Sequence, residues 1–297
     1  MGLRVHSERI LELIDEQSAI EQIATGLGFT EGPIWNPDGY LLFSDLFDDV
    51  RRRWDERAGL AAVAAPSHKG NGMTLDADHR LIVCEHATSC LARMSPDGGG
   101  TDRTVLASHY EGASLNSPND VVVDSRGRIY FSDPTYGRMR GVGVERAREL
   151  SFQGVYRIDP DGAGPYLLVD DFAQPNGLCF SPDEATLFVS DTERGDIRAF
   201  DVGDDGLLRN GRAFGVNVGA GADGMKCDEL GNLWATGPGG IWIFSPEGEH
   251  WGLVELEEPV ANIHWGGPDW TWLFITATSS VFRMPTNVCG RRESFMC

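Results

Sequence analysis

The sequence predicts an all-β fold, a six-bladed β-propeller in which each blade is a sheet of four strands. The first observation behind this prediction is a repeat that occurs six times along the 297 residues. The second is that each copy has the pattern of a β-hairpin, two strand-like segments around a turn. The third is composition, because the chain has 37 glycines, 8 tryptophans and few long helical patterns.

Each copy of the repeat begins with an acid or an amide, continues through a turn, and ends in a second β-rich segment. Successive copies start 39 to 57 residues apart, close to the period of propeller blades. They start at Glu31, Asn71, Asn119, Asn176, Asp223 and Asn262. Segments such as Leu41–Phe43 and Leu187–Val189 have strand composition, and residues such as Pro37–Gly39 form the turn between them. Further strand candidates after the hairpins give four strands per blade, whereas a β-sandwich does not predict six matched starts.

The six repeats nearly fill the chain, so we expect a single propeller domain over residues 1–297. Within it, residues 1–17 are expected to be an N-terminal arm, either a short helix or an extended segment, with disorder as the alternative. A closed ring needs its two ends joined. We therefore expect residues 18–26 to complete the sixth blade as its outer strand.

The charge argues against two classes of partner. The chain has 25 Lys and Arg against 45 Asp and Glu, a net charge of −20. Nucleic acids and anionic membranes are therefore not expected partners, because phosphate binding needs clustered basic residues. The chain has no apolar run long enough to span a membrane, and its start lacks the apolar core of a signal peptide. Its six cysteines lack zinc-site spacing, so we expect reduced thiols in a cytoplasmic protein. The sequence carries no signal for an oligomeric state.

The six starting residues share a chemical property. If each opens the innermost strand of its blade, the six form a ring around the mouth of the central channel. All six carry side-chain oxygens, and two of them are carboxylates. Oxygen ligands that converge on one axis suit a hard divalent cation. The alternative is that these residues only cap turns between the blades.

The second strand of each hairpin returns to the same mouth. Four of these strands end in an acid, at Asp45, Glu85, Asp133 and Asp191. These acids could support the ring or form a further cation site, or they could accept hydrogen bonds from backbone amides. A long loop over residues 134–153 follows the third acid and is expected to be a lid or a pocket wall. The aromatic and imidazole candidates for the pocket are Trp35, His86, Tyr136 and Phe152.

At these residues the chain resembles the SMP-30/gluconolactonase/LRE-like family of six-bladed propeller lactonases. The resemblance runs over roughly residues 25–285, and its motifs fall in the right order and in the right blades. The motifs are FTEGPIW at Phe29–Trp35, SPND at Ser117–Asp120, FSDPTYG at Phe131–Gly137, QPNG at Gln174–Gly177 and ADGM at Ala222–Met225.

The resemblance implies one divalent cation at the bottom of the pocket, usually calcium, with Mg²⁺, Mn²⁺, Zn²⁺ and Fe²⁺ as alternatives. The family's ligands match Glu31, Asn119, Asn176 and Asp223, and Asp223 also matches its general acid/base. The residues expected to contact substrate are Asn71, His86, Tyr136 and Asn262. Animal members have an arginine for sugar contacts at the position of Ser117, so the lactonase chemistry is implied but a preference for sugars is not.

The predicted function is hydrolysis of a lactone, an aldonolactone or a related one, to its hydroxy acid. The cation would polarise the carbonyl group, and Asp223, or a water molecule beside it, would move the protons. Three alternatives stay open: a phosphotriesterase-type hydrolase that uses the same metal site, a non-catalytic binding propeller, and an enzyme similar to strictosidine synthase that needs no cation and uses a pocket carboxylate.

Overall fold

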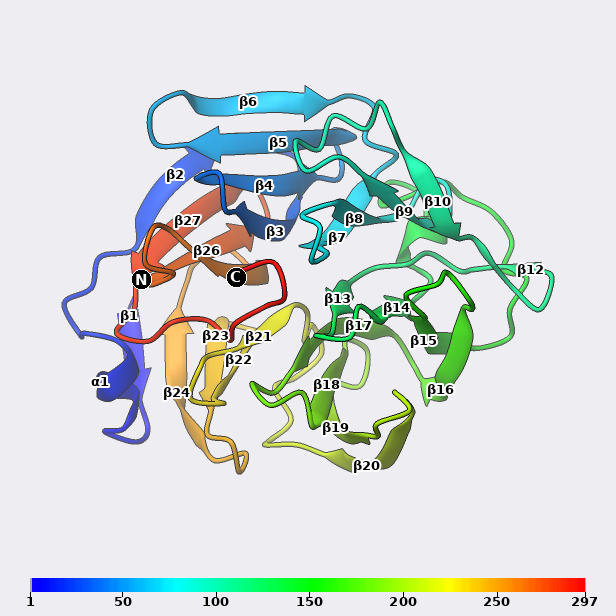
Figure 1. Cartoon of the computed structure of the whole chain (residues 1–297). Helices are drawn as coiled ribbons and strands as arrows, with labels where there is room; N and C mark the ends of the chain where they lie inside the picture. Colours follow the sequence, from blue (N-terminus) through cyan, green and yellow to red (C-terminus); the bar gives the residue numbers. More distant parts are fainter. Residues whose placement is uncertain (1, 297) are drawn as a thin grey trace.

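The computed structural model describes residues 2–296 and confirms the predicted all-β propeller. Within these residues, six antiparallel sheets of four or five strands stand around a central channel. Figure 1 shows the sheets following one another around the ring in chain order. The first strand of each sheet contacts the first strands of the neighbouring sheets, so these six strands line the channel.

The first half of the chain forms three blades. Blade 1 contains β3 (Thr30–Asn36), β4 (Tyr40–Asp45), β5 (Val50–Asp55) and β6 (Gly59–Ala64). Blade 2 contains β7 (Gly70–Leu75), β8 (Leu81–Glu85), β9 (Cys90–Met94) and β10 (Thr104–Ala107). Blade 3 contains β13 (Val121–Val123), β14 (Ile129–Asp133), β15 (Gln153–Ile158) and β16 (Tyr166–Phe172). Between blades 2 and 3 lies a small hairpin, β11 (His109–Tyr110) and β12 (Ala113–Ser114), and the loop after β14 contains the 3₁₀ helix η1 (Tyr136–Arg138).

The second half forms the other three blades. Blade 4 contains β17 (Pro175–Phe180), β18 (Thr186–Asp191), β19 (Asp196–Val202) and β20 (Leu208–Ala213). Blade 5 contains β21 (Met225–Cys227), β22 (Leu233–Gly237), β23 (Gly240–Phe244) and β24 (His250–Glu255). Blade 6 contains β25 (Val260–Gly266), β26 (Trp272–Ala277) and β27 (Ser280–Pro285), together with a strand from the other end of the chain.

That strand is β2 (Glu21–Thr25), which closes the ring. It pairs antiparallel with β27, for example Glu21 opposite Arg283, and forms the outer edge of blade 6. The outer strand expected within residues 18–26 is thus confirmed. Because blade 6 is built from both ends of the chain, opening the ring requires the loss of a whole strand pairing.

Residues 2–20, which precede β2, contain two short elements. Strand β1 (Gly2–Val5) pairs with β24 and makes blade 5 five-stranded. The short helix α1 (Ile10–Leu13) follows, and its Ile10 and Leu13 are buried in the core between blades 5 and 6. Within residues 2–17 the arm contains both of the forms expected of it, an extended segment and a short helix.

The hydrophobic core lies between neighbouring blades and explains the strand patterns. One cluster joins Leu42 of blade 1 to Val83 of blade 2, and another joins Tyr130 of blade 3 to Leu187 of blade 4. The first two strands of blade 1, β3 and β4, are buried at every position because other blades cover both faces of the sheet. The outer strand β6 has no buried residue, since it meets water at the rim.

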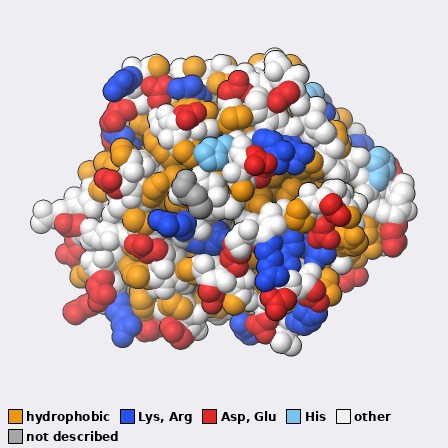
Figure 2. All heavy atoms as spheres, viewed as in Figure 1, with side chains coloured by type: hydrophobic (Ala, Val, Ile, Leu, Met, Phe, Trp, Pro, Cys, Tyr) orange, Lys and Arg blue, Asp and Glu red, His pale blue; other side chains and the backbone are white. Residues whose placement is uncertain are grey.

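Charged side chains of both signs are mixed over the face seen in Figure 2, with no single basic patch on that face. None of the helices among residues 2–296 is long and apolar enough to cross a membrane.

Candidate functional site

A cavity of about 220 Å³, here called the mouth cavity, lies where the channel-lining strands begin. Its polar floor consists of five starting residues of the repeat, each from a different blade: Glu31, Asn71, Asn119, Asn176 and Asp223. Its walls consist of Phe29, Leu46, Phe47, His86, Tyr136, Val142 and Thr192. The fold therefore brings together residues that are up to 194 positions apart in the sequence.

Seven of the eight site residues expected from the sequence line this cavity: Glu31, Asn71, His86, Asn119, Tyr136, Asn176 and Asp223. The eighth, Asn262, does not line it. It is 3% exposed, and its Nδ2 donates a hydrogen bond to Glu31 Oε2 at 3.2 Å. The structure thus places Asn262 as a support for a floor carboxylate.

Glycines after the starting residues let the floor come together. A β-carbon on Gly32 would lie 2.1 Å from the Asn71 carbonyl oxygen, and one on Gly177 would lie 2.3 Å from that of Asp223. Gly72 is equally confined, and its N–H donates to the Asn119 carbonyl oxygen at 2.8 Å. Adjacent inner strands therefore approach more closely than a side chain allows, which brings the floor residues around one axis.

The floor contains oxygen atoms that lack partners within the described chain. Asp223 Oδ1 and Asn71 Oδ1 are both buried, and neither accepts a hydrogen bond within residues 2–296. Buried polar atoms are nearly always satisfied, so these two oxygens are available to a group bound in the cavity. Two carboxylates and three amides, with no Lys or Arg side chain in the cavity lining, fit a hard divalent cation.

Most of the possible ligands on the floor are neutral amide oxygens rather than ionisable side chains. Within residues 2–296, no group of three or more His, Cys, Asp or Glu side chains is arranged to hold a metal ion. The floor combines only two such side chains, Glu31 and Asp223, with neutral amide oxygens. Zinc sites rich in Cys or His are therefore a poor chemical match for this donor set.

Burial and neighbouring negative charges make both floor carboxyl groups harder to ionise. Burial raises the pKa of Glu31 to about 7, and the charge of Asp120 acts in the same direction. Burial also raises the pKa of Asp223 well above its usual range, and the neighbouring charges of Glu31 and Asp120 add to the shift. Each carboxylate would become easier to ionise if a positive charge were bound between them.

His86 forms a neutral part of the cavity wall. Burial lowers its pKa to about 3, and the charges of Arg146 and Lys69 act in the same direction. Its Nε2 lies 3.2 Å from Asn71 Nδ2, so the neutral ring accepts a hydrogen bond from the amide. This contact turns the Asn71 oxygen, the atom without a partner, away from the imidazole.

The four acids that end the second strands have structural partners. Asp45, Asp133 and Asp191 each accept hydrogen bonds from two consecutive backbone amides ahead of the inner strand of the same blade. Glu85 instead binds both Nε and Nη2 of Arg103 at 2.7 Å. All four acids are fully buried. The structure supports their interpretation as acceptors that fix loops rather than as a second cation site.

The sequence did not identify the apolar walls of the cavity, namely Phe29, Leu46, Phe47 and Val142, nor Thr192. A signal existed, because Leu46, His86 and Thr192 each directly follow a second-strand acid and therefore emerge at the mouth.

Two other aromatic candidates do not line the mouth cavity. Trp35 stacks on Phe274 and lines a separate cleft of about 730 Å³ between blades 1 and 6. Phe152 packs against Tyr110 beside blade 3.

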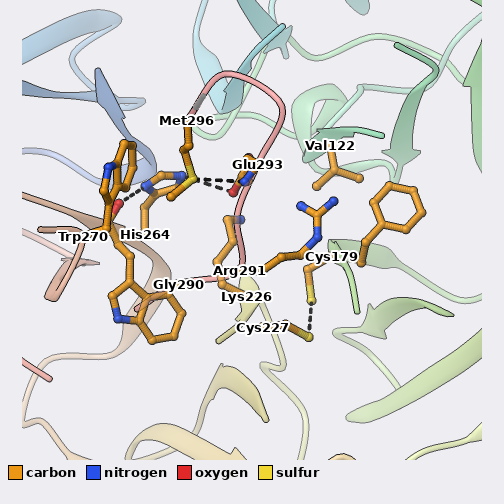
Figure 3. Close-up of a pocket in the computed structure, with 12 residues that line it drawn as sticks. Val122, Cys179, Lys226, Cys227, His264, Trp270, Gly290, Arg291, Glu293 and Met296 are labelled. Carbon is orange, nitrogen blue, oxygen red and sulfur yellow. Dashed lines mark hydrogen bonds and ion pairs between the residues drawn. The ribbon is translucent and has the colours of Figure 1, made fainter. Parts of the chain in front are cut away.

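The opposite end of the channel is covered by the C-terminal segment, residues 290–296, which crosses in front of it in Figure 1. Beneath the segment lies a cavity of only about 20 Å³, and Figure 3 shows Glu293 and Met296 of the segment together with His264 from the channel wall. His264 Nε2 lies 3.5 Å from Glu293 Oε1. Phe295, 1% exposed, anchors the segment in the core of blades 1 and 2.

Comparison with known proteins gives consistent matches. The family model described as the SMP-30/gluconolactonase/LRE-like region matches residues 29–279. A gluconolactonase from Zymomonas mobilis is 34% identical in an alignment of 310 positions that covers 96% of this chain and 86% of that protein. The structure of a gluconolactonase from Xanthomonas campestris is 30% identical, with a TM-score of 0.90 and coverage of 96% and 95% of the two chains. A lactonase from Staphylococcus epidermidis is 25% identical over 82% of this chain and 74% of its own length.

Proposed function

This chain belongs to the SMP-30/gluconolactonase/LRE-like family, and on that premise we propose that it hydrolyses a lactone to its hydroxy acid in the mouth cavity with one divalent cation. Relatives named gluconolactonase and lactonase support a hydrolase that acts on lactones. The observation that carries the proposal is the floor, where two carboxylates and three amides from five blades meet and two of their oxygens have no partner within residues 2–296.

In this proposal Glu31, Asn119, Asn176 and Asp223 hold the cation, and calcium is the first ion to test because every donor is an oxygen. When bound, the cation polarises the lactone carbonyl and stabilises the negative charge that develops on its oxygen. Asn71 also lies on the floor and presents its free oxygen to the same cavity. Asn262 holds Glu31 in place through the hydrogen bond between their side chains.

Asp223 is the proposed acid/base. It accepts a proton from the water molecule that attacks the carbonyl carbon, and it returns a proton to the ring oxygen when the bond between that carbon and the ring oxygen breaks. The products are the carboxylic acid and the hydroxyl group of one open-chain molecule, so no further reactant is needed.

The test is hydrolysis of glucono-δ-lactone and of simpler lactones, followed as acid release, with metal-stripped protein and with each divalent cation restored. Activity that is lost on stripping and returns with a cation supports both parts of the proposal. Undiminished activity after stripping would remove the cation from the mechanism. If no lactone is hydrolysed with any cation, the proposal fails, and phosphotriesters are the next substrates to test on the same floor.

Asp223→Asn and Glu31→Gln separate the roles within the floor. Asp223→Asn should abolish turnover while the fold is kept, because it removes the proton acceptor but little volume. Glu31→Gln should weaken cation binding and restore part of the turnover at high cation concentration. Normal turnover by Asp223→Asn would eliminate Asp223 as the acid/base. The matched control is Asp78→Asn, since Asp78 is an exposed acid far from the cavity lining.

A further inference from the structure

The mouth cavity separates polar and apolar groups into two levels. Its carboxylate and amide groups all belong to the floor, whereas Phe29, Leu46, Phe47 and Val142 present only hydrocarbon to the space above it. The Phe29 and Phe47 rings lie 5.2 Å apart with their planes inclined by 30°. Phe47 is 47% exposed, an unusual state for an aromatic ring on a surface facing a cavity. A ligand that reaches the floor must therefore pass along an apolar wall.

Three polar side chains stand in the walls: Thr192, Tyr136 and His86. Thr192 Oγ1 donates to the Ala222 carbonyl oxygen at 2.7 Å and accepts from Asn176 Nδ2 at 2.9 Å. His86 Nε2 accepts from Asn71 Nδ2, whereas the buried His86 Nδ1 has no hydrogen-bond partner within residues 2–296. A substrate hydroxyl group can therefore find partners at the floor and beside His86, but it finds none against the hydrocarbon of the other walls. No Lys or Arg side chain lines the cavity to supply additional donors.

The apolar walls are held in place by backbone contacts. On one side the Leu46 N–H donates to the Phe29 carbonyl oxygen at 2.8 Å, which ties the two short loops of blade 1 together. On the other side Arg146 Nη2 donates to the His86 carbonyl oxygen at 2.7 Å and Arg138 Nε donates to that of Asn116 at 2.8 Å. These bonds fasten the loop that carries Val142 to blade 2 and blade 3. The cavity is thus preformed rather than assembled around its ligand.

The physical consequence is a preference among lactones. Each methylene group moved from water to an apolar wall strengthens binding about fourfold. Each hydroxyl group that leaves water without finding a partner weakens binding about 5- to 150-fold. A polyhydroxylated ring meets the second effect wherever its hydroxyl groups lie against Phe29, Phe47 or Val142, while a hydrocarbon substituent there meets only the first.

We propose that the substrate is a lactone whose ring carries an alkyl or aryl substituent, with the ester group on the floor and the substituent against Phe29, Phe47 and Val142. This inference rests on the proposed function, because it identifies the substrate class of that same site. Phe47 is the main specificity-determining residue, since its ring is half exposed and is free to lose water to a ligand.

The test compares three lactones with the same six-membered ring on the cation-loaded full chain: δ-valerolactone, its pentyl-substituted derivative, and glucono-δ-lactone. We expect kcat/KM for the pentyl derivative to exceed that of δ-valerolactone about tenfold or more, and glucono-δ-lactone to be the poorest of the three. If glucono-δ-lactone is preferred over the pentyl derivative, the inference is overturned while the proposed function stands. If none of the three is hydrolysed, both fail.

Variants of the wall locate the effect. In Phe47→Ala, the ratio of kcat/KM for the pentyl derivative to that for δ-valerolactone should fall about tenfold, through a higher KM for the pentyl derivative with kcat kept. Phe47→Leu should restore most of the ratio because it restores hydrocarbon. The control is Leu230→Ala, which removes a 64% exposed leucine outside the cavity lining and should change neither value. An unchanged ratio in Phe47→Ala would refute the assignment of the wall.

Discussion

Glu31→Gln should make the cation-free protein more stable at pH 8, although it removes a proposed cation ligand. Glu31 is 3% exposed, and without a cation it shares the floor with Asp223 and lies near the charge of Asp120. Glutamine has the same shape and keeps an oxygen that can accept from the Gly32 N–H and from Asn262. The substitution therefore removes a buried negative charge while it preserves the packing.

The magnitude follows from the pKa of Glu31, which burial raises from 4.5 to about 7. Below about pH 4.5 this carboxyl is protonated in both the folded and the unfolded chain. As the pH rises toward 7, the unfolded chain loses its proton first, so the folded state loses stability relative to it, and above pH 7 the loss is constant. Each unit is worth about 1.4 kcal/mol, so the full penalty is about 3 kcal/mol at pH 8 and less than about 1 kcal/mol at pH 5.

The assay is urea unfolding of chelator-treated wild type and Glu31→Gln at both pH values. We expect a gain of up to about 3 kcal/mol at pH 8, or about 6 °C in Tm, and little difference at pH 5. Calcium should then stabilise wild type and have a much smaller effect on the variant. A contrasting control is Asp45→Asn, which should lose stability at pH 8 because Asp45 accepts from two backbone amides and from Arg52 Nε at 2.7 Å.

Two results would refute the reasoning. An equal gain at pH 5 and pH 8 would mean that charge burial is not its cause. A variant less stable than wild type at pH 8 in chelator would mean that the Glu31 carboxylate is already satisfied without a cation.

Three further predictions concern residues around the site. Gly32→Ala should lower the free energy of unfolding in urea by about 3 kcal/mol or more, since the new β-carbon would lie 2.1 Å from a carbonyl oxygen. The control is Gly39→Ala, whose β-carbon would meet no atom within 4 Å and which should cost about 1 kcal/mol. Arg146→Met should raise KM in lactone hydrolysis with the fold retained in circular dichroism, because its guanidinium fastens the Val142 loop to the His86 carbonyl oxygen; an unchanged KM would mean that the loop is held by other contacts. Burial opposes the ionisation of Glu293, but its contact with His264 lowers the pKa of Glu293 to about 2. The stability that the carboxylate contributes is therefore present above about pH 4.5 and is lost as the pH falls toward 2. Glu293→Gln should cost about 1–3 kcal/mol at pH 7 and flatten the acid side of the curve of unfolding free energy against pH, and an unaltered acid side would contradict this.

The fold and the floor could be predicted because both follow from periodicity. Each blade repeats the same sequence pattern, so six matched starting residues imply six equivalent positions around an axis. The ring position of Asn119 could thus be inferred from that of Glu31 without any knowledge of the blades between them. The glycines carried the same information, since Gly32 and Gly177 follow starting residues at the points where inner strands come closest.

The walls could not be predicted because they do not repeat. Phe47 and Val142 lie on loops of different length and conformation, and only the folded loops decide which side chain faces the cavity. Aromatic content alone misled the expectation for Trp35 and Phe152, whose rings are used in packing between strands. The N-terminal arm was similarly ambiguous, since the short α1 is stabilised by its burial against blades 5 and 6 rather than by its own sequence.

The C-terminal segment that covers one end of the channel also determines from which end a small molecule can enter. Under the proposed function, reactant and product both pass through the mouth, because Phe295 and Glu293 lie at the other end of the channel. A lactone is uncharged, but the hydroxy acid formed from it is an anion at neutral pH, and the chain around it has a net charge of −20. The field of the protein therefore leaves the incoming molecule unaffected and repels the outgoing one. Ring opening itself thus creates the charge that drives the product out, and accumulated hydroxy acid should be a weak inhibitor whose affinity rises with ionic strength.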